Sequence, residues 1–248
     1  MSRAEGIYGL WLREFKVFTR ERSRVLTSIF TPILWIFVFG GGLGSVVDIG
    51  GVNYQVFIYP GILAMSVLFT SVFYGVYIVW DRRIDILKEV LVAPLSRTSI
   101  FVGKVLGGCT DSMIQASVML LISFAVGVTL STTAFILALL LLFLLTLSLV
   151  STGLVIGSLM ESPEGFNMVV SFLVFPLFFF SGALYPLDNL PTWLSAITYI
   201  DPVTYGVDGL RTVIIGVSRF PFYIDLAVLV VFAVIMFTVG TKAFEHMK

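Results

Sequence analysis

The stretch that decides the fold runs from Ser112 to Met160 and reads SMIQASVMLLISFAVGVTLSTTAFILALLLLFLLTLSLVSTGLVIGSLM. It contains no Asp, Glu, Lys or Arg. A helix that crosses the apolar core of a bilayer, about 30 Å thick, needs about 20 apolar residues, so this stretch is too long for one crossing. It must therefore fold back, and the turn-forming segment 127–132 is where we expect the reversal. The sequence predicts two membrane-spanning helices here.

Outside this stretch, four more apolar runs have the length of a membrane span. The six predicted spans are 25–47, 56–80, 105–128, 134–160, 166–184 and 222–241. Composition agrees, because 58% of the 248 residues are hydrophobic and only 12% are charged. A water-soluble fold of this length would expose too much apolar surface. We therefore expect an all-α fold, in which residues 1–248 form one polytopic membrane domain.

The basic residues predict how the spans are oriented. All but two of the 15 Lys and Arg residues lie in 1–24, in 81–104 or in 242–248, and the exceptions are Arg211 and Arg219. Short cytoplasmic segments collect Lys and Arg. We therefore expect a multi-pass protein of the inner or plasma membrane with both termini in the cytoplasm.

The N-terminal segment 1–24 is expected to form an amphipathic cytoplasmic interface helix. Apolar side chains recur at helical spacing: Ile7, Trp11, Phe15 and Phe18. Basic side chains fall on the opposite side: Arg13, Lys16 and Arg20. Such a helix binds the surface of an anionic membrane through its apolar face and its basic groups. It would serve as a lipid anchor alone, or also as a docking surface for a cytoplasmic partner.

A second amphipathic stretch, 81–97, is expected to form a cytoplasmic coupling helix. Its apolar stripe is Ile84, Leu87 and Leu91, and Pro94 ends it. The charged residues lie largely on the other side: Arg82, Arg83, Asp85, Lys88 and Glu89. If a soluble motor drives this protein, force enters through this segment and the N-terminal helix. The alternative is a solvated linker helix between two spans.

The segment 185–219 contains proline, glycine and Asp-Pro positions that typically interrupt helices. Asp201 is placed to cap a helix that begins at Pro202 and ends at Gly216. We expect two short re-entrant helices that dip into the outer leaflet, buried against the spans. Asp208 and Arg211 are spaced to share one helix face and to neutralise each other.

The sequence lacks the motifs of several catalytic classes. There is no G-x-x-x-x-G-K-[ST] phosphate loop, no G-x-S-x-G elbow and no H-E-x-x-H pair. The single cysteine, Cys109, and the single histidine, His246, cannot build a metal site together. We therefore expect no catalytic residues, no metal ligands and no cofactor in this chain. Asp111, inside the third span, is read as the partner of a basic group such as Lys104, or alternatively as a proton site.

Several motifs together carry a resemblance to a known family. They are WDRR at 80–83, LVAPLSR at 91–97, GK at 103–104, SG at 181–182, YPL at 185–187, LP at 190–191 and DPVTYGVDGLR at 201–211. With the N-terminal amphipathic helix, they resemble the type-2 ABC transporter permeases, in particular the daunorubicin-resistance and nodulation-factor export group. The resemblance covers nearly the whole chain.

The resemblance implies a homodimer that works with two copies of a separate cytoplasmic ABC ATPase, which would hold ATP and Mg. It implies ATPase contact for charged and aromatic positions of both amphipathic segments: Trp11, Arg13, Lys16, Arg82, Arg83, Asp85, Lys88 and Glu89. The translocation path would lie between the two permeases. No nucleic acid is implied, and membrane lipids are the other partner.

Aromatic residues on the fifth span are candidates for the lining of the translocation path, but they do not choose among classes of cargo. Phe172, Phe175 and Phe179 surround Pro176 and suit an amphipathic drug, a lipid or a lipid-linked glycan, although phenylalanines in spans also simply face lipid. Two other functions stay open at this stage. One is an ion-coupled secondary transporter, and the other is a membrane anchor subunit that transports nothing.

Overall fold

The computed structural model describes residues 3–44, 48–49, 52–86, 95–187 and 190–247. Within them, six helical spans are long and apolar enough to cross a membrane, as predicted. They are α2 (Arg22–Leu43), α3 (Tyr54–Phe73) continued by α4 (Val76–Arg83), α6 (Arg97–Ile122), α7 (Thr132–Leu159), α8 (Pro163–Phe180) and α11 (Phe222–Glu245). The strands in the described part, β1 (Asp48–Ile49) and β2 (Val52–Asn53), form one short antiparallel pair. The all-α fold is therefore confirmed.

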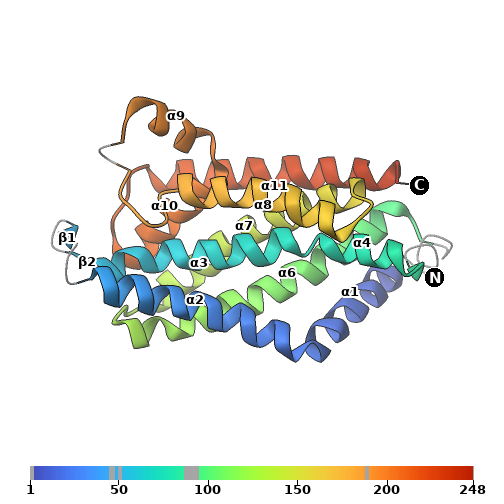
Figure 1. The fold of residues 1–248 in the computed structure, drawn as a ribbon, viewed down its shortest axis with the longest axis horizontal. Coiled ribbons are helices and arrows are strands. Elements are labelled where there is room, and N and C mark those ends of the chain that lie inside the picture. Colours follow the sequence, from blue (N-terminus) through green and yellow to red (C-terminus); the bar gives the residue numbers. More distant parts are fainter. Residues whose placement is uncertain (1–2, 45–47, 50–51, 87–94, 188–189, 248) are drawn as a thin grey trace.

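The spans run along the long axis of the molecule, and the two termini lie at the same end (Figure 1). The helix α1 (Arg3–Arg20) and the end of α4 are also at this end, which we call the terminal end. The β1–β2 pair lies at the opposite end. The helices α9 (Thr192–Ile200) and α10 (Pro202–Ile215) occupy the segment in which two short helices were expected.

The reversal inside the uncharged stretch occurs where the sequence predicted it. The 3-10 turn η1 (Ser123–Val126) is followed by Gly127 with φ of 81°. The side chain of Ser131 then accepts a hydrogen bond from the backbone N–H of Ala134 at 3.1 Å. Glycine adopts positive φ without steric cost, and a serine N-cap satisfies a free N–H of the first turn. These two residues end one span and begin the next.

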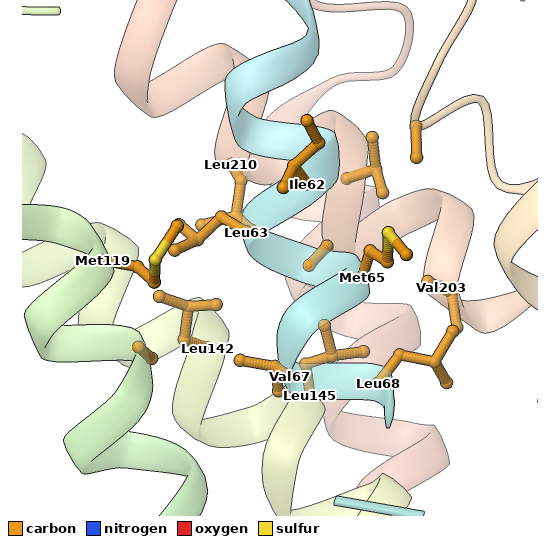
Figure 2. Packing of buried hydrophobic residues seen from close by; sticks show 14 of the residues in the cluster. Ile62, Leu63, Met65, Val67, Leu68, Met119, Leu142, Leu145, Val203 and Leu210 are labelled. Carbon is orange, nitrogen blue, oxygen red and sulfur yellow. The ribbon is translucent and has the colours of Figure 1, made fainter. Parts of the chain in front are cut away.

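The core is built around α3. Figure 2 shows Ile62, Leu63, Met65, Val67 and Leu68 of α3 packed among side chains of three other helices. Those partners are Met119 of α6, Leu142 and Leu145 of α7, and Val203 and Leu210 of α10. The span α3–α4 is mostly buried, whereas α2 and α11 are mostly exposed. One span thus lies at the centre of the protomer and the others surround it.

At the terminal end, α1 buries one face against the bundle. The buried face of α1 is formed by Gly6, Leu10, Glu14 and Phe18, because this helix packs against α6. Of the apolar stripe that the sequence predicts, Phe18 belongs to this buried face, whereas Ile7, Trp11 and Phe15 are partly exposed, and their contact with a membrane surface stays a prediction.

A correction concerns the start of the coupling segment. Asp81, Arg82 and Arg83 belong to the end of α4, so a coupling helix does not begin at Asp81. The chain turns after Arg83, and Asp85 has φ of 59°. Lys88 and Glu89 lie outside the described residues.

Candidate transmission site and membrane cavity

Glycines on α6 let α1 approach the bundle closely. A Cβ at Gly103 would lie 2.7 Å from Cβ of Leu10, and a Cβ at Gly107 would lie 2.6 Å from Cβ of Glu14. Gly103 and Gly107 are four residues apart and therefore share one helix face. Small residues at this spacing allow two helices to pack with their backbones close together. This contact places Glu14 of α1 directly over Lys104 of α6.

Lys104 lies at the centre of a buried cluster of charges. Its side chain is fully buried, and Nζ donates to Oε1 of Glu14 at 3.1 Å and to Oδ2 of Asp81 at 2.6 Å. Glu14 and Asp81 are 5% and 7% exposed. The three charges come from α1, α4 and α6, so one ammonium group joins three helices.

Arg13 and Tyr74 complete this group, which we call the charge cluster: Arg13, Glu14, Tyr74, Asp81 and Lys104. Nη2 of Arg13 donates to Oδ1 of Asp81 at 2.7 Å, and Nη1 donates to Glu14 at 3.2 Å. The hydroxyl of Tyr74 donates to Oε2 of Glu14 at 3.0 Å. Burial lowers the pKa of Arg13, but the hydrogen bond and the charge of Asp81 outweigh it and raise that pKa.

The charge cluster is neutral, with two cations and two anions. A buried ionic group of this kind has a strict geometry, because each charge needs its partners in place. The three helices that carry these charges are therefore held in one relative arrangement. A displacement of α1 relative to α6 would be transmitted to α4 through Lys104.

The cluster corrects one expectation and adds a residue. Lys104 contacts Glu14 and Asp81, so its expected pairing with Asp111 was wrong. Glu14 was not among the predicted site residues. The signal was present, since Glu14 lies between Leu10 and Phe18 at helical spacing, and a carboxylate on an apolar face requires a partner.

The other predicted coupling residues have separate positions at the terminal end. Nε1 of Trp11 donates to Oγ1 of Thr110 at 2.9 Å, and Lys16 is exposed. Arg82 donates to the carbonyl oxygens of Ser158 and Met160 at 2.8 and 2.7 Å, so it satisfies the last carbonyls of α7. Arg83 is more than half exposed and lies 3.7 Å from Glu164. Contact with an ATPase stays a prediction for all of them.

Next to the charge cluster is a cavity of about 490 Å³, bounded by α2, α3, α4, α6 and α8 and called here the α2–α8 cavity. Among its lining residues are Phe175 and Phe179, two of the three predicted path residues. Phe172 is not in the lining and is 85% exposed. Tyr74 belongs both to the lining and to the charge cluster.

The lining of this cavity contains both polar and aromatic side chains. The amide of Gln115 donates to the carbonyl of Ser28 at 2.7 Å and accepts from the hydroxyl of Thr70 at 2.5 Å. Aromatic rings meet edge-on, with centroids 6.1 Å apart for Trp35 and Phe178 and 5.5 Å apart for Phe69 and Phe175. The wall is therefore mostly apolar with a few polar groups, as in many ligand-binding cavities.

Comparison with known proteins identifies the family. The model of the ABC-2 type transporter family matches residues 5–215. The chain belongs to this family. It is therefore an ABC-2 transport permease, an integral multi-pass membrane protein, as the sequence resemblance had indicated.

Similar curated proteins cover almost the whole permease. The inner membrane transport permease YadH of Escherichia coli strain K12 is 29% identical over 239 residues, which are 93% of this chain and 91% of YadH. Nodulation protein J of Rhizobium leguminosarum bv. viciae is 25% identical over 236 residues, 94% of this chain and 91% of that protein. The residues that the family model matches, 5–215, include the positions of the charge cluster and α10.

In this ABC-2 permease, the predicted cap of α10 is confirmed. Oδ1 of Asp201 accepts a hydrogen bond from the backbone N–H of Val203 at 2.8 Å, Pro202 is in the first turn, and Gly216 ends the helix with φ of 74°. How deeply α9 and α10 enter a membrane stays a prediction.

The expected pairing of Asp208 with Arg211 was wrong, because in the described residues each has other partners. The carboxylate of Asp208 accepts hydrogen bonds from the backbone N–H groups of Arg219 and Phe220 at 2.9–3.1 Å. Arg211 donates to the carbonyl of Gly182 at 2.9 Å, and its guanidinium lies 4.1 Å from the ring centroid of Phe57. Asp208 thus holds the loop that leads to α11.

The described residues contain no group of three or more His, Cys, Asp or Glu side chains that could hold a metal ion.

Proposed function

We propose that this chain is the membrane-spanning permease subunit of an ATP-driven exporter. A separate cytoplasmic ABC ATPase would bind ATP and Mg, with two ATPase copies serving a permease homodimer. Permeases of this family typically work with an ATPase partner. The observation that carries the proposal is Tyr74, whose hydroxyl binds Glu14 of the charge cluster and whose ring lines the α2–α8 cavity.

Force from an ATPase has a short route to the cavity. The ATPase would contact α1 and the end of α4, which are both at the terminal end (Figure 1). Glu14 and Asp81 share Lys104, so the helices that receive the force move together with α6. Because Tyr77 and Gln115 also line the cavity, a shift of α4 or α6 changes its shape. The charge cluster is thus proposed as the element that transmits the ATPase stroke.

The exposed apolar side chains indicate where cargo and partner copy would meet this subunit. Phe30 and Phe37 of α2 are each 59% exposed, and Phe172 of α8 is 85% exposed. These helices flank the α2–α8 cavity. A second copy of the chain placed against them would enclose the cavity, and lipid would cover the remaining apolar surface. An amphipathic drug, lipid or lipid-linked glycan would then leave toward the outer side.

The proposal is tested by purification from gently solubilised membranes, followed by ATPase and transport measurements in liposomes. An ABC ATPase recovered in about equal amount, with vanadate-sensitive flux, is the expected result. A proton-dependent flux that vanadate leaves unchanged would instead identify an ion-coupled transporter. A partner recovered without ATPase activity or flux would identify an anchor subunit.

The coupling surface is tested by Arg83→Glu. This side chain is exposed and makes one long ion pair, so its reversal leaves the fold intact. We expect less ATPase in the purified complex. Lys242→Glu is the matched control, because Lys242 is also exposed near the terminal end but lies on α11, away from α1 and α4. Arg82 is unsuitable for this test, since it binds the end of α7.

A further inference from the structure

We propose that Asp225 is a proton-binding site, which exchanges its proton with the solution when α10 and α11 separate. Asp225 is in the first turn of α11, at the end of the molecule opposite to the terminal end (Figure 1). Its side chain is 0% exposed, and neither carboxyl oxygen has a hydrogen-bond partner among the described residues. These observations involve no ATPase and no cargo, so the inference does not rest on the proposed function.

The first argument is the cost of an isolated buried charge. A carboxylate removed from water needs hydrogen bonds or a counter-ion, and without them it takes up a proton and becomes neutral. The helix α7 packs against α11 and contains no Asp, Glu, Lys, Arg or His, and α11 has no other charged residue before Lys242. The helix α6 also meets α11, but at the terminal end, where Phe101 packs against Gly240. Asp225 is therefore held as a neutral carboxylic acid.

The second argument is the neighbouring carboxylate, Asp208 of α10. Its oxygens accept hydrogen bonds from the backbone N–H groups of Arg219 and Phe220 at 2.9–3.1 Å, which stabilise the anion. Asp208 is next to Gly209, where a Cβ would lie 3.4 Å from Cβ of Asp225. When two carboxyl groups are close together, the one with hydrogen bonds to its charged form ionises and the other keeps its proton. This pair thus consists of one anion, Asp208, and one acid, Asp225.

The other ionisable groups of α10 and of the loop before α11 have partners of their own. The hydroxyl of Tyr205 donates to the carbonyl of Tyr199 at 2.9 Å. The guanidinium groups of Arg211 and Arg219 donate to backbone carbonyl oxygens. Asp201 accepts a hydrogen bond at the start of α10. None of these described groups forms an ion pair or a hydrogen bond with the carboxyl of α11.

Separation of α10 from α11 would admit water to Asp225 and change its charge. A solvated Asp side chain is ionised above about pH 4, so the carboxyl O–H bond breaks and the proton passes to water. The new anion is then repelled by Asp208, which favours the separated arrangement. In the predicted orientation this end faces outward. Acid outside would therefore hold α10 against α11, and alkali would loosen this contact.

Hydrogen–deuterium exchange of residues 217–224, which join α10 to α11, tests the inference on the full chain in nanodiscs. Release of one proton on opening raises the opening equilibrium constant about tenfold per pH unit. After correction for the intrinsic dependence on hydroxide, we expect exchange to rise with about this slope from about pH 5 to about pH 7. Asp225→Asn has the shape of the neutral acid and should keep the segment protected without a slope. Asp225→Ser, also uncharged, serves if that variant does not fold.

Two matched controls separate Asp225 from other carboxyl groups. Asp201→Asn removes another buried carboxyl at the same end and should keep the slope. In infrared spectra at neutral pH, the band of an un-ionised carboxyl group should be weaker in Asp225→Asn and unchanged in Asp85→Asn, because Asp85 is exposed. No slope in the natural chain, an equal slope in Asp225→Asn, or an infrared band that this variant leaves unchanged would overturn the inference. Exchange that depends on Na⁺ or K⁺ at constant pH would assign the carboxylate to a metal cation and would also overturn it.

Discussion

At the scale of single residues, Lys104 is a fully buried cation that binds two buried carboxylates. Lys104→Met would leave Glu14 and Asp81 buried and close together without their shared cation. Removing one member of a buried ionic group destabilises proteins by about 3–5 kcal/mol. We expect a marked loss of folded protein, measured by size-exclusion chromatography and thermal unfolding.

The double variant Lys104→Met with Asp81→Asn is the informative comparison. It restores a neutral cluster, since Arg13 and Glu14 then balance each other. We expect it to be more stable than Lys104→Met alone, because the uncompensated charge is the costly species. If the double variant loses at least as much as the two single variants together, the cluster is not balanced in the way described.

Asp201 provides a test by pH. Burial raises the pKa of its carboxyl to about 8, although the hydrogen bond from Val203 opposes this. In the unfolded chain the carboxyl would titrate near about 3.9. Between these values the folded protein holds more protons, so stability falls as the pH rises from about 4 to about 8.

Asp201→Asn should remove this dependence, because Asn also caps helices and does not titrate. The measurement is the unfolding temperature between pH 5 and pH 8, which shifts by about 2–4 °C per kcal/mol in a protein of this size. We expect a fall with pH in the natural protein and a smaller one in the variant. Parallel curves would show that Asp201 is not the titrating group.

At the scale of helices, the contact between α7 and the α3–α4 junction has the least space. A Cβ on Gly153 would collide with the backbone of Val72, and one on Gly157 with the backbone of Gly75. Gly153→Ala should therefore separate the two spans and cost about 1–3 kcal/mol. Gly41→Ala is the control, because a Cβ at Gly41 has no described neighbour within 4 Å. Thermal unfolding of both variants measures the difference, and equal stability would contradict close packing here.

The helices also show what a sequence can and cannot predict. Local signals gave the reversal at Gly127 and the cap at Asp201, because those depend on a few adjacent residues. The role of Glu14 was missed because its partner, Lys104, is 90 residues away in the chain. The same reason hid the role of Arg82, whose acceptors are on α7. Hydrophobic periodicity finds helices, but the partners of charged side chains depend on tertiary packing.

At the scale of the whole molecule, the distribution of charge agrees with the arrangement of the helices. The two basic residues outside the predicted cytoplasmic segments are both engaged by the protein. Arg211 lies over Phe57 and binds Gly182, and Arg219 binds the carbonyl of Leu187 and lies 5.5 Å from the ring centroid of Tyr199. Such contacts stabilise these two positive charges, which lie outside the predicted cytoplasmic segments where Lys and Arg usually collect.

The orientation of the terminal end decides whether a cytoplasmic ATPase can reach α1 at all. Cys109→Ala gives a chain without cysteine, into which Ser218→Cys or Glu245→Cys is introduced. Both positions are exposed, Ser218 before α11 and Glu245 at its end. In intact cells, a membrane-impermeant maleimide should label the cysteine at 218, and the cysteine at 245 only after permeabilisation. The opposite labelling pattern would place the charge cluster on the outer side of the membrane. A cytoplasmic ATPase could not contact α1 there, and this outcome would contradict the proposed exporter mechanism.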